Sequence, residues 1–265
     1  MQGSPVVPCP VVQRVQYKTT DHPRRAASFL IINPQPTMNQ RERISQILSS
    51  LERTNENLLD LSDDIWLSID HNDPDELEAG VEFKQQYNAA MAEFATVAEH
   101  LQQLITGYTR VAPDDEATSP SADADEHSRI IQELDRSERH SLDEDFRYKR
   151  PFGFAFEGHA VKDLRTWRAL YERVIRLLAR LKGDAFMRIA TDQAFETNRG
   201  NRMFAPTGDG MRHSNEILPG LHVELNLSAN SIRDMIKRLL EHFDYDPANF
   251  HVYLREDRDF VGNEV

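Results

Sequence analysis

Apolar residues recur every three or four positions along residues 38–110, with charged and polar residues between them. This is the period of an amphipathic α-helix. The first series is Ile44, Ile47, Leu48, Leu51, Leu58, Leu59, Leu61, Ile65 and Trp66, and the second is Tyr87, Met91, Phe94, Val97, Leu101, Leu104 and Ile105. The pattern predicts two long helices that form an antiparallel hairpin.

The turn between the two helices carries a helix-start signal. Asp73 is suited to cap the second helix, Pro74 to its first position, and Glu76 completes a capping-box spacing. Two such helices expose a wide apolar face, which a third helix, a second copy or another protein must cover. We expect the hairpin to dimerise or to dock on a partner, with the interface residues Leu51, Leu58, Trp66, Phe94 and Leu101.

The pattern changes after the hairpin. Residues 111–126 are small, acidic and proline-containing, which is typical of a linker, and residues 127–145 contain a candidate third helix from His127 to Leu142. Residues 146–258 then alternate between short strand patterns and amphipathic helices, and residues 259–265 form a tail. The expected elements are strands on both sides of Glu157 and Gly158, helices over 165–182 and 183–195, a long loop with one short strand over 197–220, a strand over 221–227, a helix capped by Ser228, and a strand over 250–257. The order ββα(α)ββαβ predicts an α+β fold for this part.

Charge is distributed unevenly along the chain. Residues 1–145 contain 27 acidic and 12 basic residues, a net charge of −15, whereas residues 146–265 contain 17 acidic and 19 basic residues, a net charge of +2. A step of this size indicates a boundary between two parts of the molecule. The chain has one cysteine, Cys9, which excludes an internal disulfide framework. Residues 1–37 are rich in proline and have no period, so we expect a disordered leader, and we interpret the protein as cytoplasmic with no membrane partner.

Three segments of the C-terminal part together resemble a known module. They are RPFGFAFEG, RTWRALYERV and GLHVELNLSANSI, and the resemblance covers about residues 151–257. This part resembles an uncharacterised α+β module of bacterial and archaeal proteins associated with restriction and phage defence. The resemblance implies a defence or nucleic-acid-processing setting and assigns no catalytic residue.

A basic cluster is the strongest candidate for a binding surface. Residues 147–188 contain 11 basic and four acidic residues. The candidate contact residues are Arg147, Lys149, Arg150, Arg165, Arg168, Arg173, Arg176, Arg180 and Lys182. A row of arginines on one helix favours phosphate contact. The same residues can instead be solvated or pair with the acidic first half of this chain or of a second copy, and we favour this interpretation. The acidity of the whole chain also disfavours tight non-specific binding of nucleic acid.

No pattern establishes a catalytic or metal site. Pro74-Asp75 followed by Glu82 and Lys84 matches the letters of a metal-dependent nuclease, but these residues lie on a predicted helix. His222, Glu224 and Asn226 share one face of a predicted strand, which we interpret as its solvated side. We expect no cofactor and no metal.

The leading hypothesis is a non-enzymatic accessory protein with a helical oligomerisation arm (38–110) and an α+β recognition domain (146–258). One alternative is a nucleic-acid-processing enzyme with its site in the loop from Arg199 to His213. The other is a structural adaptor whose arginines bind its own acidic helices.

Overall fold

The structure is a computed structural model that describes residues 38–111, 124–196, 200–209, 211 and 214–256. The predicted leader and tail, and all but the ends of the predicted linker, lie outside these residues.

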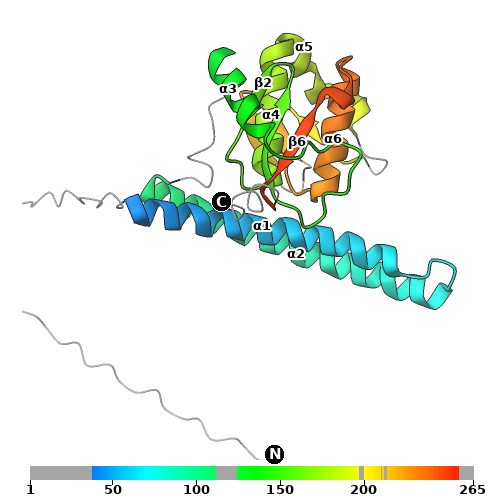
Figure 1. The fold of residues 1–265 in the computed structure, drawn as a ribbon. Coiled ribbons are helices and arrows are strands. Elements are labelled where there is room, and N and C mark those ends of the chain that lie inside the picture. Colours follow the sequence, from blue (N-terminus) through cyan, green and yellow to red (C-terminus); the bar gives the residue numbers. More distant parts are fainter. Residues whose placement is uncertain (1–37, 112–123, 197–199, 210, 212–213, 257–265) are drawn as a thin grey trace, which may run out of the picture. The chain divides into compact units, whose positions relative to one another are not determined.

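Two long helices form the predicted hairpin (Figure 1). Helix α1 spans Met38–Ser68 and helix α2 spans Pro74–Thr109. The Asp73 carboxylate accepts hydrogen bonds from the backbone N–H groups of Asp75 and Glu76, at 2.9 and 3.2 Å, so the predicted cap is confirmed. The Glu76 carboxylate instead accepts from the Asp70 N–H, which ties the start of α2 to the turn before it.

Specific contacts set the register of the two helices. The Tyr87 hydroxyl of α2 donates to the Leu58 carbonyl of α1 at 2.8 Å, and the Lys84 ammonium donates to the Ser62 hydroxyl at 2.6 Å. Near the tip, an added Cβ at Gly80 would lie 2.3 Å from Ile69 Cδ1. The two helices are therefore in close contact at the tip of the hairpin, and side-chain hydrogen bonds join them further along.

The third helix is shorter than its sequence pattern predicts. Helix α3 spans Ala124–Leu134, after which the Ser137 N–H bonds to the Leu134 carbonyl in a turn. The chain then pairs His140 with Val252 as an isolated bridge. Because this backbone pairing needs an extended chain, the helix ends before Leu142 despite the apolar spacing.

The first sheet has the strand order β2-β1-β6, with β1 at Pro151–Phe156, β2 at His159–Val161 and β6 at His251–Leu254. All pairings are antiparallel. Glu157 and Gly158 make the predicted turn with φ angles of 48° and 73°, a conformation suited to glycine and to a two-residue hairpin. Helix α3 covers one face of this sheet through Ile130 and Leu134.

The second sheet has the order β3-β5-β4, again antiparallel, with β3 at Phe204–Ala205, β4 at Ser214–Leu218 and β5 at Leu221–Glu224. The region predicted as a loop with one strand thus supplies two edge strands.

The main core lies between these sheets and the helices α4, Trp167–Lys182, and α6, Ala229–His242. Thr166 and Ser228 cap them, each with a side-chain oxygen that accepts a backbone N–H. The helix predicted over 183–195 is only partly helical: it consists of α5, Asp184–Met187, and the 3₁₀ turns η1, Arg188–Thr191, and η2, Gln193–Phe195. A third 3₁₀ turn, η3, spans Pro247–Asn249. Helices followed by small antiparallel sheets confirm the α+β class.

Candidate functional site

One side of α1 carries a row of carboxylates that meets the α+β part of the chain. Glu52, Glu56, Asp60 and Asp63 follow one another at spacings of four, four and three residues, so they share a helix face. Glu56 and Asp60 are buried although both are acidic. Residues 35–265 form one compact unit, in which this row joins the hairpin to the sheets and helices that follow.

Two of these carboxylates bind the N-terminal ends of helices. Glu56 accepts a hydrogen bond from the Arg168 N–H in the first turn of α4, at 2.9 Å. Asp60 accepts from the Ala229 N–H at the start of α6, at 3.1 Å, and from the Tyr148 N–H at 3.0 Å. The first N–H groups of a helix have no partner within the helix and carry a partial positive charge. Helix α1 therefore docks by supplying side-chain hydrogen-bond acceptors to two helix ends.

Burial raises the pKa of both carboxyl groups. It raises the pKa of Asp60 to about 6, although the N–H groups of Tyr148 and Ala229 act in the opposite direction. Burial, and then the neighbouring Glu52, raise the pKa of Glu56 well above its usual range. The docking contact is therefore sensitive to pH in a mildly acidic range.

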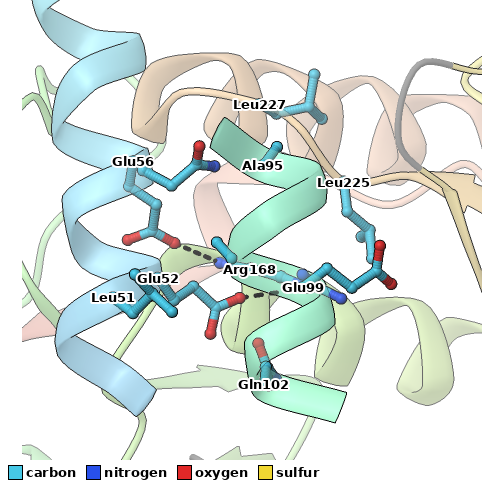
Figure 2. A pocket seen from close by; sticks show the side chains of 11 residues that line it. Leu51, Glu52, Glu56, Ala95, Glu99, Gln102, Arg168, Leu225 and Leu227 are labelled. Atoms are coloured by element: carbon cyan, nitrogen blue, oxygen red, sulfur yellow. Dashed lines mark hydrogen bonds and ion pairs between the residues drawn. The ribbon is translucent and has the colours of Figure 1, made fainter. Parts of the chain in front are cut away.

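Arg168 lies at the centre of the contact between the hairpin and α4 (Figure 2). Its Nε lies 3.3 Å from a Glu52 carboxylate oxygen and 3.1 Å from a Glu172 carboxylate oxygen. Burial acts to lower the pKa of Arg168, but Glu52, Glu172 and Glu99 outweigh it, so that the pKa is raised. The adjoining cavity has a volume of about 30 Å³, room for water but not for a substrate.

A second ion-pair contact lies further along α1. The Arg147 guanidinium pairs with Asp64 of α1 and with Asp145. The Tyr148 hydroxyl donates to the other Asp64 oxygen at 2.6 Å. Two residues predicted as nucleic-acid or partner contacts, Arg147 and Arg168, thus bind the acidic helix of the same chain.

The other predicted basic residues fall into different surroundings. Lys149 lies over the Phe146 ring, Arg150 pairs with Glu256, and Lys182 donates to the Phe243 carbonyl. Arg173 is half-buried and Arg176 and Arg180 are exposed. The row of cations predicted on one helix is therefore divided between a docked part and an exposed part.

Arg165 and Arg150 line an open groove of about 390 Å³ that the sequence did not indicate. They meet there with Arg53 of α1 and Arg255 after β6. Because these four residues come from separate segments, no pattern in the sequence predicts that they line one groove.

The predicted helical interface residues lie on the hairpin and remain partly exposed to solvent. Leu51, Leu58, Trp66 and Phe94 are half-buried, and Leu101 is 46% exposed. The exposed apolar residues of the two helices also include Ile47, Leu61, Phe83, Val97, Leu104 and Tyr108. At 100° per residue, Ile47 and Leu61 lie opposite the carboxylate row of α1, and the α2 residues lie opposite Glu99. The face of the hairpin turned away from the α+β part therefore carries a series of exposed apolar residues.

The patterns considered for catalysis do not come together in the described part of the chain. Lys84 binds Ser62 and Asp63, whereas Asp75 and Glu82 are exposed on α2. No group of three or more metal-ligating side chains occurs among the described residues. Arg199, Gly210, Arg212 and His213 of the alternative enzyme site lie outside the description.

The polar face predicted on the strand over 221–227 is not solvated throughout. Glu224 is buried in β5, the middle strand of its sheet. Its charge adds to burial in raising the pKa of Tyr171 on α4. The alternating pattern predicted a solvated position for Glu224. The side chain is buried because β5 is the middle strand of its sheet and lies near α4.

Comparison with known proteins finds no family model, no curated protein and no solved structure that matches the chain. Within the described ranges, every helix is too short or too polar to cross a membrane.

Proposed function

We propose that this chain is a non-enzymatic accessory protein that self-associates through the outer apolar face of its hairpin and so pairs two α+β domains. The observation that carries the proposal is the exposed apolar surface on both helices, on the side opposite the docked domain. The resemblance of residues 151–257 to a defence-associated module supports the further proposal that it serves a bacterial or archaeal defence system.

A second copy of the same chain fits this face well. Ile47 and Val97 are each 58% exposed, and Leu104 is 57% exposed. The face spans roughly 30 Å along two helices that together are about 20 Å wide, so two copies would bury about 1,200 Å² in total, the lower end of a stable interface. Two hairpins facing each other make a four-helix bundle.

Light scattering on the full chain tests the proposal. We expect about twice the 30.6 kDa mass of one chain for the wild type. Leu104→Asp would place a charge in the apolar face and should weaken the dimer at least about a hundredfold, giving monomers. Ala92→Asp, an exposed site on another side of α2, serves as the control and should leave the dimer intact. A wild-type mass of one chain at micromolar concentrations would refute the proposal.

Contact with nucleic acid through the α+β domain is a second candidate. The exposure of Arg176 on α4 favours it, because this side chain can reach a phosphate backbone without disturbing the docking contact of Arg147 and Arg168. Fluorescence anisotropy of a labelled single-stranded oligonucleotide over a salt series tests this candidate. Arg176→Gln should weaken binding and reduce the salt slope by about one, and unchanged binding would contradict it.

A further inference from the structure

We infer that two copies of the hairpin pack antiparallel along α2, so that the tip of each copy lies beside the open end of the other. This arrangement rests on the proposed self-association and adds to it the direction and the register of the contact.

Helix α2 carries an unbroken seven-residue repeat of uncharged, mostly apolar residues. One series is Phe83, Ala90, Val97 and Leu104, and the other is Tyr87, Phe94, Leu101 and Tyr108. The two series alternate at spacings of four and three residues, which is the a and d pattern of a left-handed coiled coil. Such a repeat keeps the same residues against a partner helix over the whole of its length.

Helix α1 of the same chain covers only one side of this seam. Tyr87 and Phe94 are half-buried, and the Tyr87 hydroxyl binds the α1 backbone. Every member of the series that begins at Phe83 is exposed, Val97 by 58% and Leu104 by 57%. The open side of the seam therefore fits the same seam of a second copy.

The distribution of charge along the hairpin selects the direction of the second copy. Residues 70–82, at the tip, contain six acidic residues and no lysine or arginine, and all six are exposed. Residues 38–44 and 104–111, at the open end, contain three exposed arginines, Arg41, Arg43 and Arg110, and one acidic residue, Glu42. Parallel copies would place two acidic tips together, whereas antiparallel copies bring each tip to the arginines of the other.

The size of the side chains agrees with an antiparallel register. The repeat from Phe83 to Tyr108 has its midpoint between residues 95 and 96, so a two-fold axis there pairs all of its positions. At the centre, Phe94 then lies opposite Val97 of the second copy. Next to this pair, the small Ala90 lies opposite the larger Leu101, as close packing between helices requires.

The same register improves the electrostatic contacts at both ends. Glu82 at the tip comes to the level of residue 109 of the second copy, next to Arg110. Glu93 is exposed beside the seam, and the antiparallel arrangement offsets the two Glu93 carboxylates by about 8 Å along the axis. A parallel arrangement would place them at the same level.

Disulfide formation between copies tests the direction and the register. All variants carry Cys9→Ser, which removes the one native cysteine. Ala90→Cys with Leu101→Cys in one chain should give covalent dimers under mild oxidation, whereas neither single variant should. The two sites of one chain lie about 17 Å apart along α2, too far for an internal disulfide. Ala92→Cys with Gln103→Cys is the matched control, because it has the same separation at exposed sites on another side of α2, and it should not crosslink.

Light scattering of the reduced proteins separates the two levels of the proposal. A mass of one chain removes the self-association itself. A mass of two chains, with crosslinks in both single variants, shows parallel copies and overturns the antiparallel arrangement alone. A mass of two chains without crosslinks between positions 90 and 101 overturns the register.

Charge reversal at the tip gives the two directions opposite signs. In an antiparallel dimer, Glu78→Lys with Glu82→Lys should weaken self-association about tenfold at low salt, because the lysines meet the arginines of the second copy. In a parallel dimer the same change would relieve repulsion between the tips and strengthen self-association. Adding Arg41→Glu and Arg43→Glu to the same chain should restore the affinity, and stronger association of the tip variant, or no restoration, would overturn the antiparallel arrangement.

Discussion

Individual side chains in this protein have roles that depend on where the fold buries them. Asp60 and Arg176 are both charged, yet Asp60 is buried against two backbone N–H groups while Arg176 faces solvent. Sequence position alone does not separate such residues, because both lie on amphipathic helices.

Asp60 should make stability depend on pH. Its folded pKa of about 6 lies above the usual 3.8, so its protonation contributes stability that is fully present below about pH 3.8 and is lost as the pH rises through 6. Asp60→Asn has no charge to titrate, so its melting temperature should vary less than that of the wild type between about pH 4 and about pH 6.

The matched control is Glu93→Gln, at an exposed position of α2. Thermal melts of the three proteins over this pH range decide the outcome, and parallel curves for Asp60→Asn and wild type would contradict it. Asp60 itself contributes to the raised pKa of Glu56, so the comparison reports the two coupled carboxylates together.

Arg168 should be the most sensitive cation of the chain to replacement. Arg168→Met keeps the length of the side chain but leaves Glu52, Glu99 and Glu172 without their counter-charge. We expect a loss of about 3 kcal/mol in the free energy of unfolding, measured with urea. Arg176→Met should change it by less than about 0.5 kcal/mol, and equal effects would show that the ion pairs at Arg168 contribute little.

At the scale of elements, local signals in the sequence predicted most of what formed. The Asp73 cap, the turn at Glu157 and Gly158, and the cap at Ser228 all depend on neighbours within a few residues, so sequence alone predicted them. The predictions failed where backbone pairing between segments far apart in the sequence determines the secondary structure. Helix α3 ends early because His140 pairs with Val252, and residues 214–218 form a strand because they pair with β5.

The candidate site was less predictable than the fold for the same reason. The carboxylate row of α1 is visible as a spacing, but the backbone groups it binds are set by the tertiary structure. The capped N–H of Ala229 is 169 residues from Asp60. The arginines of the groove come from four separate segments, so only Arg150 and Arg165 were in the predicted basic cluster.

Two glycines, Gly153 and Gly107, differ in the space that the tertiary structure leaves around them. An added Cβ at Gly153 of β1 would lie 2.3 Å from the Val161 carbonyl oxygen, whereas at Gly107 of α2 it would meet nothing within 4 Å. Gly153→Ala should therefore cost about 1–3 kcal/mol in unfolding free energy. Gly107→Ala should add about 0.5–1 kcal/mol, since alanine favours a helix. Urea unfolding distinguishes the two signs, and a neutral Gly153→Ala would mean that β1 and β2 separate without cost.

At the scale of the whole molecule, the hairpin has two faces with opposite chemistry. Its acidic face binds the α+β domain of the same chain through Glu56, Asp60 and Asp64. Its other face carries a series of exposed apolar residues, which is the basis for the proposed dimer. The uneven charge along the sequence thus does not divide the described chain into separate bodies, because the negative helix docks on the later part.

The order of these parts along the chain has a consequence for synthesis. Helix α1 leaves the ribosome long before Tyr148, Arg168 and Ala229 exist, so Glu56 and Asp60 are made as hydrated anions and remain so while the hairpin forms from nearby contacts. The cost of removing their water is deferred until the second half of the chain is available to bind them. The nascent hairpin stays charged and hydrated on this side until its own domain covers it.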